Sequence, residues 1–307
     1  MTVHGFARAG GWLVCPAGMA PVAIVTDSTA YVPTEHLERH GIQVVPLYVV
    51  FGGDRTVPET DITDYGAFFE ELRSSDSLPT TSQPSVGDFV SAYDPLLAEG
   101  SEVVSIHISA GLSGTTEAAR QAAAALQREG KGGERVRVID SRTAAGALGL
   151  LVLVAAHAAR AGASAEDVLE RVGEARRELK MWFALDTLEF LKRGGRIGAA
   201  SAWIGSTLRI KPILTVESEL TPVERVRTAA RMFERLVDYA RQRHESGADG
   251  WAVQHIDAAE QCDRLVSRCR EIFGCDPVLV SEIGPVLSAH TGPGLLGVGS
   301  VPMRLLT

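Results

Sequence analysis

The chain has 307 residues, of which 45% are hydrophobic and 22% are charged, as in an ordinary globular protein. This length exceeds that of a small disulfide-stapled module and suits one large or two medium domains. The formal net charge of −8 argues against a nucleic-acid backbone as the main partner, and aromatic residues, at 6%, are too few to form rows for base stacking.

Residues 1–20 contain a short apolar patch at 11–14, which is shorter than the apolar core of a signal peptide. We interpret residues 1–20 as a disordered extension, or as the result of a start codon placed too early. The longest apolar run, 144–156, falls short of the roughly 18 residues that a membrane span needs. We therefore expect a buried helix there and no stable membrane insertion. The four cysteines lack C-x-x-C spacing and fit a protein of the reducing cytoplasm.

The first part of the chain alternates predicted strands with predicted helices. In 64–73, for example, apolar residues recur at i, i+3, i+4 and i+7, which is typical of an amphipathic helix. Strands are expected at 22–26, 42–51, 102–108 and 135–139, and helices at 64–73, 86–97, 115–129, 143–161 and 165–179. This alternation predicts a mainly parallel α/β domain over residues 21–180.

The pattern changes after residue 180. Strands are expected at 181–185, 210–216, 251–256 and 277–280, and helices near 229–243 and 258–272. The turn at 217–219 joins two strand-like runs and predicts a hairpin. We infer a second, α+β domain over residues 181–307, with a cleft between the two domains.

Three segments carry polar groups suited to anions. The hydroxyl-rich loop 80–84 could donate hydrogen bonds to a carboxylate or phosphate, or could form the turn ahead of the next helix. The loop 109–116 places Ser113 near a helix N-terminus, where it could meet an anion or simply cap the helix. The segment 284–294 has two Gly-Pro steps around His290, and its glycines would let a ligand approach closely.

Nucleotide binding through known phosphate loops is disfavoured, because loop 109–116 lacks the lysine of G-x-x-x-x-G-K-[ST] and no G-x-G-x-x-G occurs in it. The basic turn 192–196 could contact a phosphate or an acidic partner, or could be a solvated helix end. Two alternatives to simple ligand binding remain open at this point. One is a hydrolase with Ser113 as nucleophile and His290 as base, although no G-x-S-x-G elbow is present. The other is a module that binds phosphate or sugar phosphate with the same loops.

Taken together, the motifs resemble those of the DegV family, the fatty-acid-binding proteins of bacteria. The matching segments are 25–30, 80–85, 111–115, 188–198, 211–214 and 290–294. They occur in the family's order from about residue 22 to residue 300, so the resemblance covers nearly the whole chain. One departure is Ser109-Ala110-Gly111, where the family often has Ser-Ser-Gly.

The resemblance implies two α/β lobes with one long-chain fatty acid buried between them, and no other cofactor and no metal. It implies that the carboxyl group is held by Thr81, Ser113 and His290. As supporting residues of the same loops we expect Thr80, Ser82, Ser109 and Gly114. The physical argument agrees, since a buried carboxylate needs several donors and each buried methylene contributes about 0.8 kcal/mol.

The resemblance also implies a non-catalytic role. In some members of the family the protein is the binding subunit of fatty acid kinase, and it presents the carboxylate to a separate ATP-using kinase subunit. Arg196 and Arg227 match the basic residues that the family uses for this docking or for contact with the phosphate.

Overall fold

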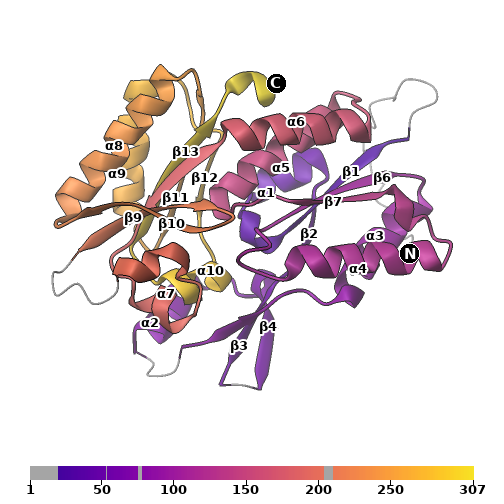
Figure 1. Cartoon of the computed structure of the whole chain (residues 1–307), viewed down its shortest axis with the longest axis horizontal. Coiled ribbons are helices and arrows are strands. Elements are labelled where there is room, and N and C mark those ends of the chain that lie inside the picture. The colour runs from indigo at the N-terminus through magenta and orange to yellow at the C-terminus, as the bar shows by residue number, and fades with distance from the viewer. Residues whose placement is uncertain (1–19, 53, 75–77, 204–209) are drawn as a thin grey trace, which may run out of the picture.

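The computed structural model describes residues 20–52, 54–74, 78–203 and 210–307, which form a two-lobed α/β protein (Figure 1). The predicted extension at 1–20 lies outside the described residues, apart from residue 20 itself. None of the helices in the described part of the chain combines the length and the apolar character that crossing a membrane requires.

The first lobe is built on a parallel sheet of four strands in the order β2-β1-β6-β7. The strands are β1 (Val22–Asp27), β2 (Gln43–Val45), β6 (Glu102–His107) and β7 (Val136–Asp140). The helices are α1 (Thr34–His40), α3 (Val86–Ala98), α4 (Thr115–Arg128), α5 (Ala145–Arg160) and α6 (Ala165–Glu178). Successive strand residues alternate between two cores: Val25 packs with α3 and α4, whereas Ile24 packs with α5 and α6. The parallel sheet with helices on both faces confirms the predicted α/β class.

A small antiparallel sheet, in the order β4-β3-β5, extends the first lobe. Its strands are β3 (Tyr48–Phe51), β4 (Arg55–Pro58) and β5 (Thr80–Ser82), and α2 (Tyr65–Ser74) follows β4 in the chain. Two predictions are wrong here. The single strand expected at 42–51 is two strands in two sheets, because Pro46 has no N–H with which to continue a ladder. The expected loop at 80–84 begins as β5, because Thr81 pairs with Val49.

The second lobe is built on a mixed sheet of six strands in the order β10-β9-β8-β13-β11-β12. The strands are β8 (Lys180–Ala184), β9 (Lys211–Glu217), β10 (Glu219–Val226), β11 (Gly250–Ile256), β12 (Leu279–Glu282) and β13 (Leu295–Val301). Figure 1 shows α8 (Ala229–Glu245) and α9 (Ala259–Phe273) covering its outer face. The predicted hairpin is confirmed, with Ser218 in the left-handed conformation at its turn. Strand β13, which lies between β8 and β11 in this sheet, was not predicted from the sequence.

Helix α5 joins the two lobes. It is apolar nearly all round, as the run 144–156 predicts, and most of its side chains are buried. Ile106 of the first sheet and Ala252 and Val301 of the second sheet belong to the same core as α5. The helix therefore packs between the two sheets, and the position of one lobe on the other depends on the fit of its surface.

Replacement of Gly149 by Ala should destabilise the protein. A β-carbon at Gly149 would lie 2.8 Å from the carbonyl oxygen of Ala30 and 3.2 Å from Cδ2 of Leu279, so α5 would have to move away from both lobes. Overpacking of this kind costs about 1–3 kcal/mol. Urea unfolding monitored by circular dichroism measures the change.

The matched control is Gly173→Ala on α6, where the nearest atom to an added β-carbon is the end of the Arg177 side chain at 3.8 Å. This variant should gain up to about 1 kcal/mol from helix propensity alone. Equal stabilisation by both substitutions would show that α5 is not closely packed between the sheets.

Candidate ligand-binding site

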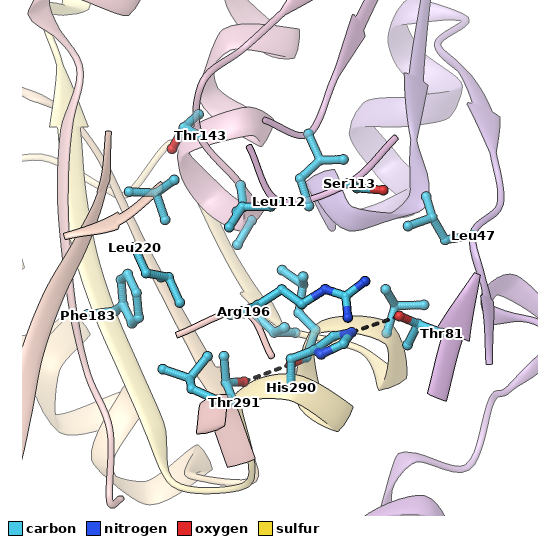
Figure 2. Close-up of a pocket in the computed structure, with 18 of the residues that line it drawn as sticks. Leu47, Thr81, Leu112, Ser113, Thr143, Phe183, Arg196, Leu220, His290 and Thr291 are labelled. Atoms are coloured by element: carbon cyan, nitrogen blue, oxygen red, sulfur yellow. Dashed lines mark hydrogen bonds between the residues drawn. The ribbon is translucent and has the colours of Figure 1, made fainter. Parts of the chain in front are cut away.

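A cavity of about 380 Å³ lies between the lobes, within the range of small-molecule sites (Figure 2). Its wall comes from β5, the loops after β6 and β7, the start of α5, and several elements of the second lobe. Most of the wall is apolar, and these residues are Leu47, Ile108, Leu112, Ala144, Ala145, Met181, Phe183, Leu191, Val216, Leu220, Ile283, Val286, Leu287 and Leu295. The cavity can therefore take a long apolar group away from water.

Part of the polar lining gathers at one place, which we call the polar end. Figure 2 shows Thr81, Arg196 and His290 close together there, whereas Phe183 and Leu220 lie on the opposite side and Thr143 lies apart. The remaining polar residues of the wall are Ser82, Gln83, Ser113, Gln254 and Thr291. This arrangement suits a ligand with one polar end and a long apolar remainder.

The central contact of the polar end is a hydrogen bond of 2.7 Å between Oγ1 of Thr81 and Nε2 of His290. The other ring nitrogen, Nδ1, is buried and has no partner among the described residues. A buried N–H without an acceptor costs more than an empty acceptor position, so we assign the proton to Nε2. In this tautomer His290 donates to Thr81, and the hydroxyl proton of Thr81 stays available for a ligand oxygen.

Burial and, to a smaller extent, the nearby charge of Arg196 together lower the pKa of His290 to about 4. The imidazole is therefore neutral at pH 7, and it acts through hydrogen bonds and not through charge. The positive charge at this end of the cavity comes instead from Arg196, whose Nη1 donates to the carbonyl oxygen of Gly194 at 2.9 Å. The backbone of Gly194 lies directly against the ring, since a β-carbon there would be 2.6 Å from Nδ1 of His290.

His290 is carried by a short helix, α10 (Pro285–Thr291). The segment 284–294 was expected to be a loop, and this prediction is wrong for its first half. Pro285 at the first helical position pre-sets the helical φ, and Gly292 ends the helix with a φ of 75°. Gly292 also has no room for a side chain, because a β-carbon there would lie 2.3 Å from the ring of Phe190 on α7 (Glu189–Arg193).

Ser113 lies in the loop between β6 and α4, as predicted, and lines the cavity. Its hydroxyl is 2.8 Å from Oγ1 of Thr115, and it can rotate toward a ligand. Gly114 brings this loop against the one that follows β5, because a β-carbon at Gly114 would lie 2.1 Å from Oε1 of Gln83. The hydroxyls of Thr81 and Ser113 thus reach one cavity from separate elements.

The structure does not bring every predicted residue to the cavity. Among the described residues of its wall, Thr80, Ser109 and Arg227 are absent. Thr80 is exposed, because its side chain points to the opposite side of β5 from that of Thr81. Ser109 is buried and donates to the carbonyl oxygen of Ser218 at 2.6 Å, so its hydroxyl ties the loop to the second lobe. Arg227 is exposed beyond the end of β10, whereas Ser82, Gly114 and Arg196 do line the cavity.

Ser105, His107 and Asp27 form a Ser-His-Asp arrangement outside the described cavity wall. Nε2 of His107 is 2.6 Å from Oγ of Ser105, and its Nδ1 is 3.1 Å from the carboxylate of Asp27. All three side chains are fully buried, and the Ser105 hydroxyl is also bonded to Tyr93 at 2.7 Å. No substrate can reach this serine, so the arrangement is structural: Asp27 accepts from the N–H of Ile108 and fixes the strand end that leads to Ser113.

Four polar residues of the wall, Gln83, Thr143, Gln254 and Thr291, were not predicted as site residues. Gln83 and Thr291 lie in motifs that were noticed, next to residues that were selected, and adjacency within the motif was the available signal. Met181 and Phe183 belong to a strand that had only a general hydrophobic pattern. No group of three or more His, Cys, Asp or Glu side chains in the described part of the chain could hold a metal ion.

The sequence model of the DegV family, a family of uncharacterised proteins, matches residues 21–303. The chain belongs to the DegV family. A DegV domain-containing protein of Streptomyces coelicolor is 41% identical over 280 residues, which are 90% of this chain and 97% of that protein.

Two solved DegV structures have the same fold. A DegV family protein from Thermus thermophilus, studied for fatty-acid binding, is 35% identical, with a TM-score of 0.81 over 92% of this chain and 99% of that one. DegV of Bacillus subtilis, a fatty acid binding protein, is 33% identical, with a TM-score of 0.81 over the same shares of the two chains, 92% and 99%. The family membership and the fold that the sequence motifs predicted are thereby confirmed.

The ring of His290 should titrate with a pKa of about 4, and Arg196→Gln should raise this value without bringing it to 6.5, because burial is the larger cause. NMR titration of the ring protons, assigned by their loss in His290→Gln, measures this pKa.

Because the pKa of His290 is lower in the folded than in the unfolded chain, the stability that His290 contributes is present above pH 6.5 and is lost as the pH falls through about 4. Arg227→Gln, outside the cavity, is the control and should leave the pKa unchanged. A wild-type value near 6.5 would contradict the burial of the ring.

Proposed function

We propose that this DegV-family chain binds one long-chain fatty acid in the cavity between its lobes. The observation that carries the proposal is the apolar cavity in which the hydroxyl of Thr81, the imidazole of His290 and the guanidinium of Arg196 lie close together (Figure 2). The carboxylate would lie at the polar end, within reach of Thr81, Ser113 and His290. The fatty acid binding of the Thermus thermophilus and Bacillus subtilis proteins supports the same ligand class here.

The energetics of such a complex have two parts. Each methylene group removed from water contributes about 0.8 kcal/mol, so the acyl chain supplies most of the affinity. The carboxylate must exchange its hydration for hydrogen bonds, and each bond to a charged group is worth about 1.5–3 kcal/mol. The free hydroxyl proton of Thr81, the rotatable hydroxyl of Ser113 and the charge of Arg196 offer these bonds at one place.

The geometry favours binding over hydrolysis. A serine nucleophile needs a base within hydrogen-bond distance, but the two side chains have different hydrogen-bond partners: Ser113 is bonded to Thr115, and His290 to Thr81. A site for a small phosphate or sugar phosphate would not need so long an apolar wall. We therefore propose a non-catalytic, cofactor-independent binding protein.

We further propose that the bound carboxylate is presented to a separate ATP-using fatty acid kinase, which forms the acyl phosphate. The polar groups lie between the lobes and not in a sealed core, since Ser82 and Arg196 are exposed to solvent in part. Arg227 is exposed and carries a positive charge in an acidic protein, and it is not part of the described cavity wall. It can therefore contact a partner without taking part in ligand binding.

Replacement of Thr81 by Val, Ser113 by Ala or His290 by Ala should weaken palmitate binding. Thr81→Val and Ser113→Ala should each lose about 1.5–3 kcal/mol, or roughly 10- to 100-fold in Kd, because a hydrogen bond to a charged group is removed. His290→Ala should weaken binding indirectly, because it removes the Nε2–H donor that leaves the hydroxyl proton of Thr81 free for the carboxylate. Calorimetric titration of delipidated protein measures the change, and denaturing mass spectrometry of the untreated protein should find a co-purified acyl chain.

Thr80→Val is the matched control for Thr81→Val, since the two residues are neighbours on β5 with side chains on opposite sides. This variant should bind palmitate as tightly as the wild type. Unchanged affinity in all three cavity variants would overturn the assignment of the carboxylate end.

Arg227→Gln should reduce acyl phosphate formation when the chain is combined with a fatty acid kinase subunit and ATP. Palmitate affinity should stay within twofold of the wild type, because Arg227 lies outside the cavity. The comparison needs both measurements on the same preparation, with Arg128→Gln on the exposed end of α4 as a charge-matched control. Equal rates of acyl phosphate formation with the wild type, Arg227→Gln and Arg128→Gln would exclude Arg227 from the docking surface.

A further inference from the structure

A buried carboxylate, that of Glu59, connects the first lobe to the helix that carries His290. Glu59 is only 2% exposed and lies in a short 3₁₀ turn, η2 (Glu59–Asp61), directly after β4. Its Oε2 accepts from the hydroxyl of Ser28 at 2.5 Å. Its Oε1 accepts from the hydroxyl of Tyr31 at 2.7 Å and from the backbone N–H of Val286 on α10 at 2.8 Å.

The partners of Glu59 extend this network to the cavity wall. The Ser28 hydroxyl accepts from the backbone N–H of Leu47 at 3.1 Å, and the Tyr31 hydroxyl accepts from that of Leu287 at 3.3 Å. Leu47, Val286 and Leu287 all line the cavity. Three backbone positions of the wall are thus held by one carboxylate and its two hydroxyl neighbours.

The network supplies hydrogen-bond acceptors for the N–H groups at the start of α10. The first N–H groups of a helix have no partner within the helix, and the residue before α10 is Gly284, which has no side chain to cap them. Val286 and Leu287 are such N–H groups, and both are satisfied from the first lobe. His290 follows Val286 by about one helical turn, so the position of its ring depends on where this end of α10 is held.

A buried carboxylate without partners would be destabilising here. The pKa of Glu59 is raised to about 7, because burial raises it by more than the hydrogen bonds from Ser28, Val286 and Tyr31 lower it. A well-packed apolar residue would avoid the cost of burying the acid but could not accept from an N–H of α10. Glu59 thus supplies an acceptor for α10 that an apolar residue could not.

We propose that Glu59 is a positioning residue for the carboxylate end of the cavity, which holds α10 so that His290 stays within hydrogen-bond reach of Thr81. The effect of Glu59 on fatty-acid affinity rests on the proposed function, whereas its effect on the position of His290 does not. An isosteric Gln can still accept from Tyr31 and Val286 and can donate to Ser28. A Leu of similar size cannot accept from any of them.

The test compares Glu59→Leu and Glu59→Gln with Ser300→Ala as a control. Ser300→Ala also removes a hydrogen bond of a buried side chain, that from Nε of Arg243, but Ser300 lies near the C-terminal end of β13 and outside the described cavity wall. Two quantities are measured: palmitate affinity by calorimetry, and the ring tautomer of His290 by side-chain ¹⁵N NMR. Thermal unfolding of each variant verifies that it is folded.

Glu59→Leu should lose at least tenfold in palmitate affinity and the Nε2–H signature of His290. Glu59→Gln should keep the signature and stay within threefold of the wild type, and Ser300→Ala should match the wild type in both measurements. A folded Glu59→Leu that keeps the signature and the affinity would overturn the proposal. So would an equal loss in Ser300→Ala, since the effect would then reflect stability alone.

If Glu59→Leu does not fold, Tyr31→Phe decides the question, because it removes one donor from Glu59 and the acceptor of the Leu287 N–H. The proposal requires a shift of the His290 signal and at least a threefold loss of affinity in this variant, and wild-type behaviour contradicts it. A wild-type protein that binds no palmitate would refute the proposed function. The His290 signal alone would then test the role of Glu59.

Discussion

The site depends on a hydrogen bond between two residues that are 209 positions apart, Thr81 and His290. Thr81 sits on the small sheet of the first lobe, and His290 on a helix inserted between strands of the second. The bond forms only if both lobes hold their elements in place. On one side Thr81 is fixed by its pairing with Val49, and on the other α10 is tied back to the first lobe by Glu59.

The cavity has both apolar and polar walls because different structural elements supply them. Much of the apolar wall comes from strands of the second lobe, such as β8, which presents Met181 and Phe183 inward. Many of the polar groups come from short segments, such as the three-residue strand β5, the loop before α4 and the brief helix α10. Backbone and hydroxyl donors are available there because regular hydrogen bonding stops. An amphipathic ligand fits a wall built in this way, with its carboxylate at the segment ends and its chain along the regular elements.

The sequence predicted the elements with strong periodicity and missed those set by distant contacts. The run 144–156 predicted α5 because its apolar character persists around the helix, and alternating strands and helices predicted the parallel sheet. Thr81, Ser113 and His290 came from motifs, and the structure brings all three to one cavity. Strand β5 was missed because three polar residues form it only by pairing with β3, and α10 because seven residues between Gly-Pro steps read as a loop. The role of Glu59 had no sequence signal, since its partners are 28 to 227 positions away.

This chain has two pairs of serine and histidine, and they show why function must be argued from burial and contacts and not from residue types. Ser105, His107 and Asp27 have the distances of a catalytic triad, yet they are fully buried and serve to fix the end of β6. Ser113 and His290 face a common cavity, yet each is bonded to a different hydroxyl neighbour. Burial removes the first pair from any substrate, and the second pair lacks the contact between serine and imidazole that activates a nucleophile. The hydrogen-bond donors that line the cavity therefore support the proposed role of holding a carboxylate.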